Sequence, residues 1–143
     1  MKYALTLLLA AASAPAIAET AITLSPLSYQ DPGGYTFDFR NVPNDLGTAV
    51  EVYVSPGNGS MYVNVAGSYF TASAWSYCPF GSTWATCFAA MNGKPIRLTN
   101  SETGQTASAT VSIVDKFEQC TRSGRVSVCA YLATLTGGTV VLN

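Results

Sequence analysis

The sequence contains no histidine, and only 10% of its 143 residues are charged. Without histidine, neither a Ser–His nor a Cys–His nucleophile system can be built, and the usual general base near neutral pH is missing. Histidine-dependent metal sites are excluded for the same reason. Any hydrolase made from this chain would therefore have to work with carboxylates.

The chain also lacks any run of lysine or arginine. Nucleic-acid binding needs a basic surface to neutralise phosphates, so we expect no nucleic-acid partner. The apolar run at residues 5–14 is too short to span a bilayer. It follows Lys2 and precedes the small-x-small sequence Ala16-Ile17-Ala18. This pattern predicts a cleaved secretory signal at residues 1–18, with a retained anchor as the alternative, and no membrane association after cleavage.

Residues 19–143 then form the mature chain, which is long enough for one domain with a core. No Pro/Ser/Gly-rich linker divides it. We therefore expect residues 19–66 and 67–143 to fold together as a single secreted domain, which we expect to be a monomer.

Cysteines are few but even in number: Cys78, Cys87, Cys120 and Cys129. Behind a secretory signal, four cysteines indicate two disulfides. The pairing is open. Cys78 with Cys87 and Cys120 with Cys129 would each close a local loop, whereas a crossed arrangement such as Cys87 with Cys120 would connect distant strands. Zinc is the competing interpretation, but no CxxC pair is present, so we expect no metal and no cofactor.

Alternation of apolar and polar residues predicts an all-β domain. It is clearest at residues 94–99 and 105–114, which a turn-prone loop at residues 100–104 joins into a hairpin. Residues 49–54 and 61–66 form a second predicted hairpin, and residues 35–39 a further strand. Between Cys120 and Cys129 we expect a loop. A short helix is predicted after it, because apolar residues recur there at three- and four-residue spacing before Gly137: Val128, Tyr131, Leu132 and Leu135.

Residues 67–142 carry several short motifs in a characteristic order. A Gly-Ser-Tyr-Phe start is followed by a cysteine, a Gly-Lys-Pro-Ile-Arg-Leu-Thr-Asn strand, a glycine-containing hairpin, a Thr-Val-Ser-Ile-Val-Asp strand and a cysteine loop. This order resembles the double-psi β-barrel of the rare lipoprotein A, barwin and expansin superfamily. The resemblance implies a small six-stranded barrel with an N-terminal β extension, residues 19–66, and one short helix near the C-terminus. A β-sandwich of eight or so strands is the alternative.

Glycoside hydrolysis needs two carboxyl groups roughly 5 to 10 Å apart. Asp115 is the best candidate for one of them. It follows an apolar strand and matches the aspartate at this place in the barwin- and expansin-like pattern; capping the next loop is its alternative role. The pattern implies a second, catalytic aspartate before the small helix, but Arg125 stands there, and an arginine cannot act as a general acid. Arg125 could instead pair with Asp115, and Glu118 is a weaker substitute for the missing acid.

Aromatic side chains are the candidate ligand-binding residues. Trp75, Tyr77 and Trp84 lie in the aromatic-rich stretch at residues 67–88. Flat rings suit sugar rings or a partner's side chains, whereas packing in the core is the alternative for each of the three. Tyr69 and Phe70 are expected in the core. Asn58 begins an Asn-Gly-Ser glycosylation sequon, which matters only in a eukaryotic source.

We therefore expect a secreted, non-catalytic binding protein that recognises cell-wall polysaccharide or a foreign protein, as an effector or inhibitor does. The resemblance implies both kinds of ligand. Two other classes stay open. One is a carboxylate-dependent enzyme that cleaves or loosens wall polysaccharide, and the other is a structural surface or pilin-like β protein.

Overall fold

The computed structural model describes residues 19–31, 36–72 and 76–143; within the strands, the side chains of residues 29–31, 115–121 and 128–131 are not described. The predicted signal segment, residues 1–18, therefore lies outside the described residues. The described part is an all-β domain with one antiparallel sheet and one helix.

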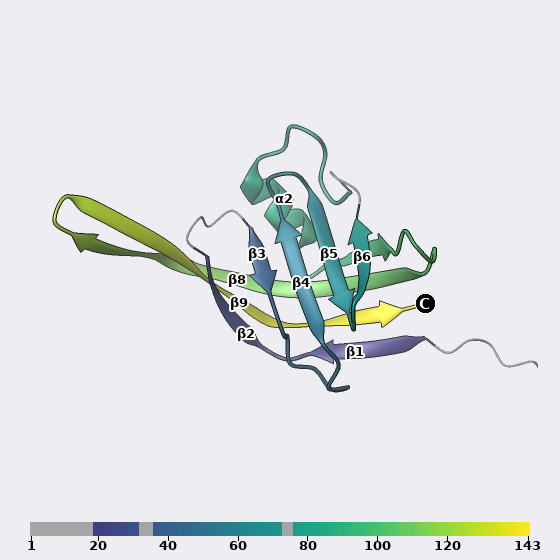
Figure 1. Ribbon diagram of the computed structural model, residues 1–143. Coiled ribbons are helices and arrows are strands. Elements are labelled where there is room, and N and C mark those ends of the chain that lie inside the picture. The colour runs from purple at the N-terminus through teal and green to yellow at the C-terminus, as the bar shows by residue number, and fades with distance from the viewer. Residues whose placement is uncertain (1–18, 32–35, 73–75) are drawn as a thin grey trace, which may run out of the picture.

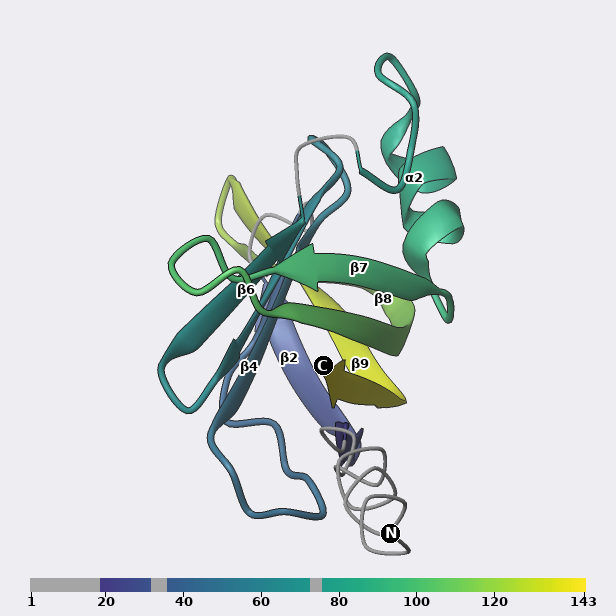
Figure 2. The ribbon, with the colours of Figure 1, turned by 90° about the vertical axis from the view of Figure 1, so that its right-hand side faces the viewer.

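The sheet contains nine strands in the part of the chain that is described. They are β1 (Thr20–Leu24), β2 (Leu27–Asp31), β3 (Phe37–Phe39), β4 (Val50–Ser55), β5 (Ser60–Val65), β6 (Ser68–Ala72), β7 (Pro95–Thr99), β8 (Thr106–Ser123) and β9 (Val126–Leu142). Their order is β1-β9-β8-β7-β6-β5-β4-β3, and β2 also pairs with β9. The sheet curls strongly, so that β3 to β6 form one layer and β7, β8, β9 and β1 the other (Figures 1 and 2).

The core lies between these two layers and consists of the apolar half of each alternating strand. Each fully buried Val, Leu, Ile, Phe or Met side chain stabilises the fold by about 1.5–3 kcal/mol. The contributing residues include Phe37, Phe39, Val50, Val52, Val54, Met61, Val63, Phe70, Leu98, Ala107, Ala109, Val111 and Ile113. The polar half of β3 to β6 is left on the outer face of the first layer. Both hairpins predicted from this alternation, β4–β5 and β7–β8, are confirmed.

The helix α2 (Trp84–Met91) was not predicted by the sequence pattern. Thr83 caps its start by accepting a hydrogen bond from the Thr86 N–H, and Cys87 and Met91 are its buried residues. Just after the helix, the side chain of Asn92 bonds both the N–H and the C=O of Ile113 in β8, at 2.7 and 2.9 Å. The amide thus takes the place of a neighbouring strand at this point and docks the end of α2 onto the sheet.

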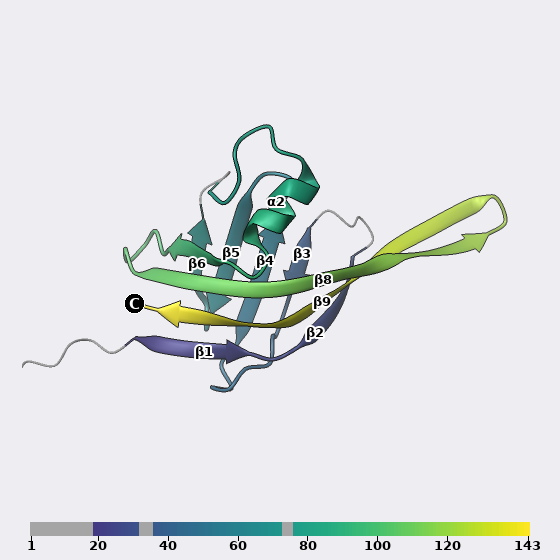
Figure 3. The same cartoon turned by 180° about the vertical axis from the view of Figure 1, so that it is seen from behind.

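The predicted loop at residues 120–129 and the predicted helix near the C-terminus are both wrong. β8 and β9 instead continue as one long hairpin that extends beyond the body of the protein as a two-stranded arm (Figures 1 and 3). Nearer the body, β9 pairs with β8 on one side and with β2 and β1 on the other. These ladders satisfy backbone groups that a helix would have to satisfy internally, so tertiary pairing overrides the local helical spacing.

Candidate functional site

Three tyrosines stand on the outer face of β4, β5 and β6. Tyr53 lies directly opposite Tyr62, and their rings stack with centroids 4.8 Å apart and planes 16° apart. The ring centroid of Tyr69 lies 5.5 Å from that of Tyr62, with the two ring planes 53° apart, and Tyr69 is 52% exposed. We refer to Tyr53, Tyr62 and Tyr69 as the tyrosine row. Because Tyr53 and Tyr62 turn ring faces toward each other, Tyr69 is the member with the most open ring.

Two carboxylates stand beside this row. Asp38 of β3 lies opposite Tyr53, and Glu51 of β4 accepts a 3.0 Å hydrogen bond from the Tyr62 hydroxyl. The Nε of Arg40 lies 3.0 Å from Asp38 Oδ2 and 3.7 Å from Glu51 Oε2. The two carboxylate side chains expose only 17% and 18% of their surface, whereas Arg40 exposes 75%. The acids are therefore largely buried in the sheet surface, whereas the arginine beside them is largely exposed to solvent.

The two carboxylates are electrostatically linked. Hydrogen bonding to Asp38, and then burial, raise the pKa of Glu51 above its ordinary value. Asp38 Oδ1 is buried and has no hydrogen-bond partner among the described residues. Two carboxyl groups can bond each other only when one of them carries a proton. A proton on Glu51 would thus supply the donor for a hydrogen bond to Asp38.

Burial, followed by the hydrogen bond to Glu51, also raises the pKa of Tyr62. The hydroxyl of Tyr62 therefore remains protonated at physiological pH and acts as a donor to Glu51. This donor keeps the carboxyl of Glu51 oriented toward the tyrosine row.

Three shallow hollows run along this face. The central hollow, about 220 Å³, is lined by Arg40, Asn41, Ala49, Val50, Glu51, Asn64 and Gly67. A second, about 140 Å³, shares Gly67 and is otherwise lined by Ser68, Tyr69, Asn100, Ser101, Glu102 and Thr103. A third, about 380 Å³, shares Arg40 and is otherwise lined by Leu27, Ser28, Asp38 and Phe39. Because neighbouring hollows share Arg40 or Gly67, they lie next to one another in a line, and Tyr69 of the tyrosine row lines the hollow at one end.

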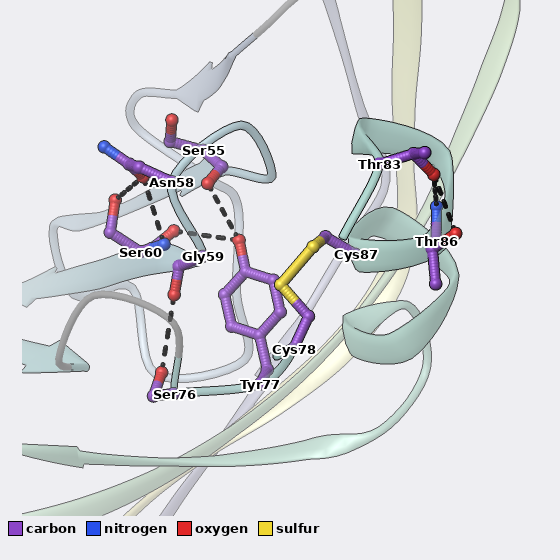
Figure 4. The surroundings of a disulfide bond; sticks show 10 residues. All are labelled: Ser55, Asn58, Gly59, Ser60, Ser76, Tyr77, Cys78, Thr83, Thr86 and Cys87. Atoms are coloured by element: carbon purple, nitrogen blue, oxygen red, sulfur yellow. Dashed lines mark hydrogen bonds between the residues drawn. A yellow bond between two sulfur atoms is a disulfide. The ribbon is translucent and has the colours of Figure 1, made fainter. Parts of the chain in front are cut away.

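The aromatic residues that the sequence singled out are used for packing. The hydroxyl of Tyr77 bonds the carbonyl oxygens of Ser55 and Ser60, at 3.0 and 3.1 Å, and its ring packs against the core (Figure 4). Trp84 stacks on Phe88 with centroids 5.2 Å apart and also packs against the core. The packing alternative therefore describes both residues. Trp75 lies outside the described residues.

The structure does not bring the other predicted site residues together. β8 does not end at Asp115, which pairs through its backbone with Ala133 in mid-strand. Arg125 lies in the turn at the tip of the arm, beyond Ser123. Ser123 comes eight positions after Asp115 along the extended strand, about 27 Å at roughly 3.4 Å per residue, so the predicted pairing of Asp115 with Arg125 is wrong. Glu118 lies on the arm opposite Tyr131; the side chains of Asp115 and Glu118 are outside the described part.

The cysteine pairing is settled in part. Cys78 is bonded to Cys87, which ties the segment before α2 to the helix and excludes the crossed pairing of Cys87 with Cys120 (Figure 4). Cys120 and Cys129 stand directly opposite each other in β8 and β9. Their side chains are outside the described part, so a second disulfide there stays a prediction.

The sequon residue Asn58 is exposed in the β4–β5 turn. Its side-chain oxygen accepts a hydrogen bond from the N–H of Ser60 at 3.1 Å. The asparagine thus has a structural role in closing this turn, whether or not it carries a glycan.

The sequence pattern did not single out the residues of the outer face. Tyr69 was expected in the core, which is wrong because its neighbour Phe70 takes the inward position in β6. The sequence does contain a usable signal. Glu51, Tyr53 and Tyr62 occupy the outward-facing positions of strands that are predicted from their alternating apolar residues. Tyrosine on the solvent side of two consecutive strands is therefore the sequence signal that marks this outer face.

Comparisons of the chain with protein-family models, with curated proteins and with solved structures find no match. Within residues 19–31, 36–72 and 76–143, no helix has the length and apolar character needed to cross a membrane. Among the residues whose side chains are described, which leaves out 29–31, 115–121 and 128–131, no three His, Cys, Asp or Glu side chains gather as the ligands of a metal ion would.

Proposed function

We propose that this protein is a secreted, non-catalytic binding protein that holds a polysaccharide, such as one from a cell wall, on the outer face of β3 to β6. The observation that carries this proposal is the exposed ring of Tyr69 at a line of hollows lined with polar side chains. An aromatic ring offers a flat apolar surface to a sugar, and a few placed polar groups supply orientation and specificity. Asn64, Glu51 and Arg40 are such groups in the central hollow.

A foreign protein is the less favoured ligand. A stable protein interface needs a contiguous patch of roughly 800 Å² per partner with an apolar centre. Among the described residues, the exposed large apolar side chains are spread over separate elements: Leu46, Tyr69, Phe80, Val114 and Val126. The shallow polar hollows of the outer face therefore suit a glycan better than an effector- or inhibitor-type protein target.

Kinship with the rare lipoprotein A, barwin and expansin superfamily remains part of the proposal. Its support is the order of motifs in residues 67–142. A closed barrel would require the curled sheet to join its ends, and β2 and β3 are the neighbouring strands between which a ladder could form. Alternate β3 amides bond to β4 in either case, so the amides on the opposite edge, facing β2, report closure: their protection against hydrogen exchange would support it, and their rapid exchange would oppose it.

Retention on insoluble polysaccharide tests the proposed function. Wild-type protein should be pulled down by at least one of cellulose, chitin and peptidoglycan. Tyr69→Ala should bind about five- to thirtyfold more weakly, because truncating an aromatic anchor costs about 1–2 kcal/mol. Phe80→Ala is the matched control, since it removes an 83% exposed ring that does not line the hollows. The proposal is wrong if no polysaccharide retains the wild type, or if Tyr69→Ala and Phe80→Ala bind equally well.

A carboxylate-dependent glycoside hydrolase is the second candidate. Its support is the adjacent pair of carboxyls, Asp38 and Glu51, which share the Nε of Arg40 at 3.0 and 3.7 Å but lie closer together than the roughly 5–10 Å found in most such enzymes. A carboxyl with a raised pKa, like that of Glu51, also suits a general acid. Release of reducing ends from a bound polysaccharide should then disappear in Glu51→Gln. Absence of any release by the wild type would leave binding as the only function of this face.

A further inference from the structure

The charged residues along the three hollows are mostly acidic. Asp38, Glu51 and Glu102 line them, whereas Arg40 is the only basic residue among the described lining residues. Arg40 is also shared between Asp38 and Glu51 through its Nε. A ligand in this line therefore meets more negative than positive charge, together with side chains that accept hydrogen bonds.

We infer that this face selects an extended glycan chain that carries free amino groups, binds neutral chains less tightly and rejects polyuronates, with Asp38 and Glu51 as the specificity-determining residues. This inference rests on the proposed function. Carboxylates accept hydrogen bonds from sugar hydroxyls and stronger, charge-assisted ones from ammonium groups. A uronate carries a carboxylate, which cannot donate a hydrogen bond to the carboxylates of the site. Like-charge repulsion therefore opposes its binding.

The range of this repulsion covers the hollows beside β3, β4 and β5. Charges act over about 8 Å at physiological ionic strength, and the carboxylates of Asp38 and Glu51 both adjoin the central hollow or its neighbour. β3 to β6 together span about 14 Å at roughly 4.8 Å between neighbouring strands. That length accommodates more than one sugar ring, so successive units of a chain would pass within range of the acidic pair.

Whole-molecule charge is the competing explanation, because the mature chain has more acidic than basic residues. Glu19→Gln separates the two effects. Glu19 is exposed just before β1 and lines none of the hollows described. Glu19→Gln and Glu51→Gln each remove one negative charge from the protein, but only Glu51→Gln removes it from the proposed site.

Affinity electrophoresis at pH 7 with three soluble probes tests the inference: glycol chitosan, hydroxyethyl cellulose and polygalacturonate. Wild type should bind them in that decreasing order. Glu51→Gln should lower the ratio of glycol chitosan to hydroxyethyl cellulose affinity about two- to fivefold, the usual size of one exposed charge interaction, and Glu19→Gln should leave it unchanged. Asp38→Asn serves as a second variant with the same expectation, and circular dichroism checks that each variant is folded.

The same experiment distinguishes a failure of charge selection from a failure of polysaccharide binding. Equal wild-type affinity for polygalacturonate and glycol chitosan, or equal effects of Glu51→Gln and Glu19→Gln, would overturn the charge selection while leaving polysaccharide binding intact. Failure of the wild type to bind any of the three probes would overturn both. Arg40→Gln gives an independent sign check: removing the positive charge should raise the preference for glycol chitosan, and a fall would contradict the inference.

Discussion

At the scale of single residues, Glu51 connects the stability of the sheet to the chemistry of its outer face. It accepts a hydrogen bond from Tyr62 and lies within ion-pair distance of Arg40. Its pKa is nevertheless raised, because the hydrogen bond to Asp38 and burial outweigh these favourable contacts. The folded protein therefore holds a proton on Glu51 more tightly than the unfolded chain does.

The sign of the resulting pH dependence follows directly. Since the folded-state pKa is raised, the stability that the Glu51 proton contributes is fully present below the ordinary value of 4.5 and is lost as pH rises through the folded-state pKa. Glu51→Gln cannot ionise and does not lose this stability. Between pH 4 and pH 7 its free energy of unfolding should therefore rise by about 0.5–1 kcal/mol relative to that of the wild type. Thermal melts at the two pH values measure this gain.

Glu102→Gln is the control for this melt series, because Glu102 is exposed in the turn between β7 and β8. Its difference from the wild type should change little with pH. A Glu51→Gln difference that shrinks from pH 4 to pH 7 would show that Arg40 and Tyr62, rather than Asp38, dominate the environment of Glu51.

At the scale of elements, β9 integrates the sheet because it pairs with β8 on one side and with β1 and β2 on the other. Such crowding leaves little space around its backbone. Gly138 lies opposite Val111 of β8 and Leu24 of β1, and a Cβ atom at this position would collide with the carbonyl oxygen of Thr110. The neighbouring Gly137 has more room, since a Cβ atom there would lie 3.9 Å from the carbonyl oxygen of Leu24.

Gly138→Ala should therefore destabilise the protein by about 1–3 kcal/mol, the usual cost of overpacking, because backbone atoms must shift to make room. Gly137→Ala, which adds the same methyl group one residue away, should cost clearly less. The midpoints of urea unfolding measure both effects. Equal midpoints for the two variants would mean that β9 is packed less tightly against β8 than the structure indicates.

At the scale of the whole molecule, the arm is separate from the body. Residues 119–130 pair only with one another within the described ladders, whereas Tyr131 and the residues after it also meet β1 or β2. In Figure 1 the arm extends away from β4, β5 and β6, the strands that carry the tyrosine row. A role in self-assembly, as in a pilin-like protein, would have to use this element or another free strand edge.

Replacing residues 119–130 by Asn-Gly should give a folded protein. Glu118 and Tyr131 lie directly opposite each other, so a two-residue hairpin turn can join them. The melting temperature should stay within about 5 °C of the wild type, since a loss of about 1 kcal/mol shifts a domain of this size by roughly that amount. Polysaccharide binding should be unchanged.

Light scattering over a range of protein concentrations completes this experiment. We expect monomers for both the full chain and the truncated one. Concentration-dependent assembly of the full chain that the truncation abolishes would favour the structural surface protein instead. An unfolded truncated protein would show that the arm supports the body.

Local sequence pattern predicted the strands whose apolar residues alternate without interruption. Residues 49–54 and 61–66 became β4 and β5 because Val50, Val52, Met61 and Val63 can reach the core only from extended backbone. The pattern did not predict α2, because aromatic residues and alanines mask its helical period. It predicted a helix within β9, where pairing with neighbouring strands favours the extended backbone instead. The same limit hid the site: the alternation showed that Glu51, Tyr53 and Tyr62 point outward, but not what they would meet.

By itself, the sequence determined the all-β class, the two regular hairpins and the face of each strand, because the direction of a strand side chain depends only on its position along the backbone. Which strands lie side by side depends on contacts between residues far apart in the chain. Tertiary structure alone therefore brought Asp38 of β3 to Glu51 of β4 and set Tyr69 beside Tyr62. It also extended β8 and β9 into an arm, because each offered the other a continuous ladder of backbone hydrogen bonds.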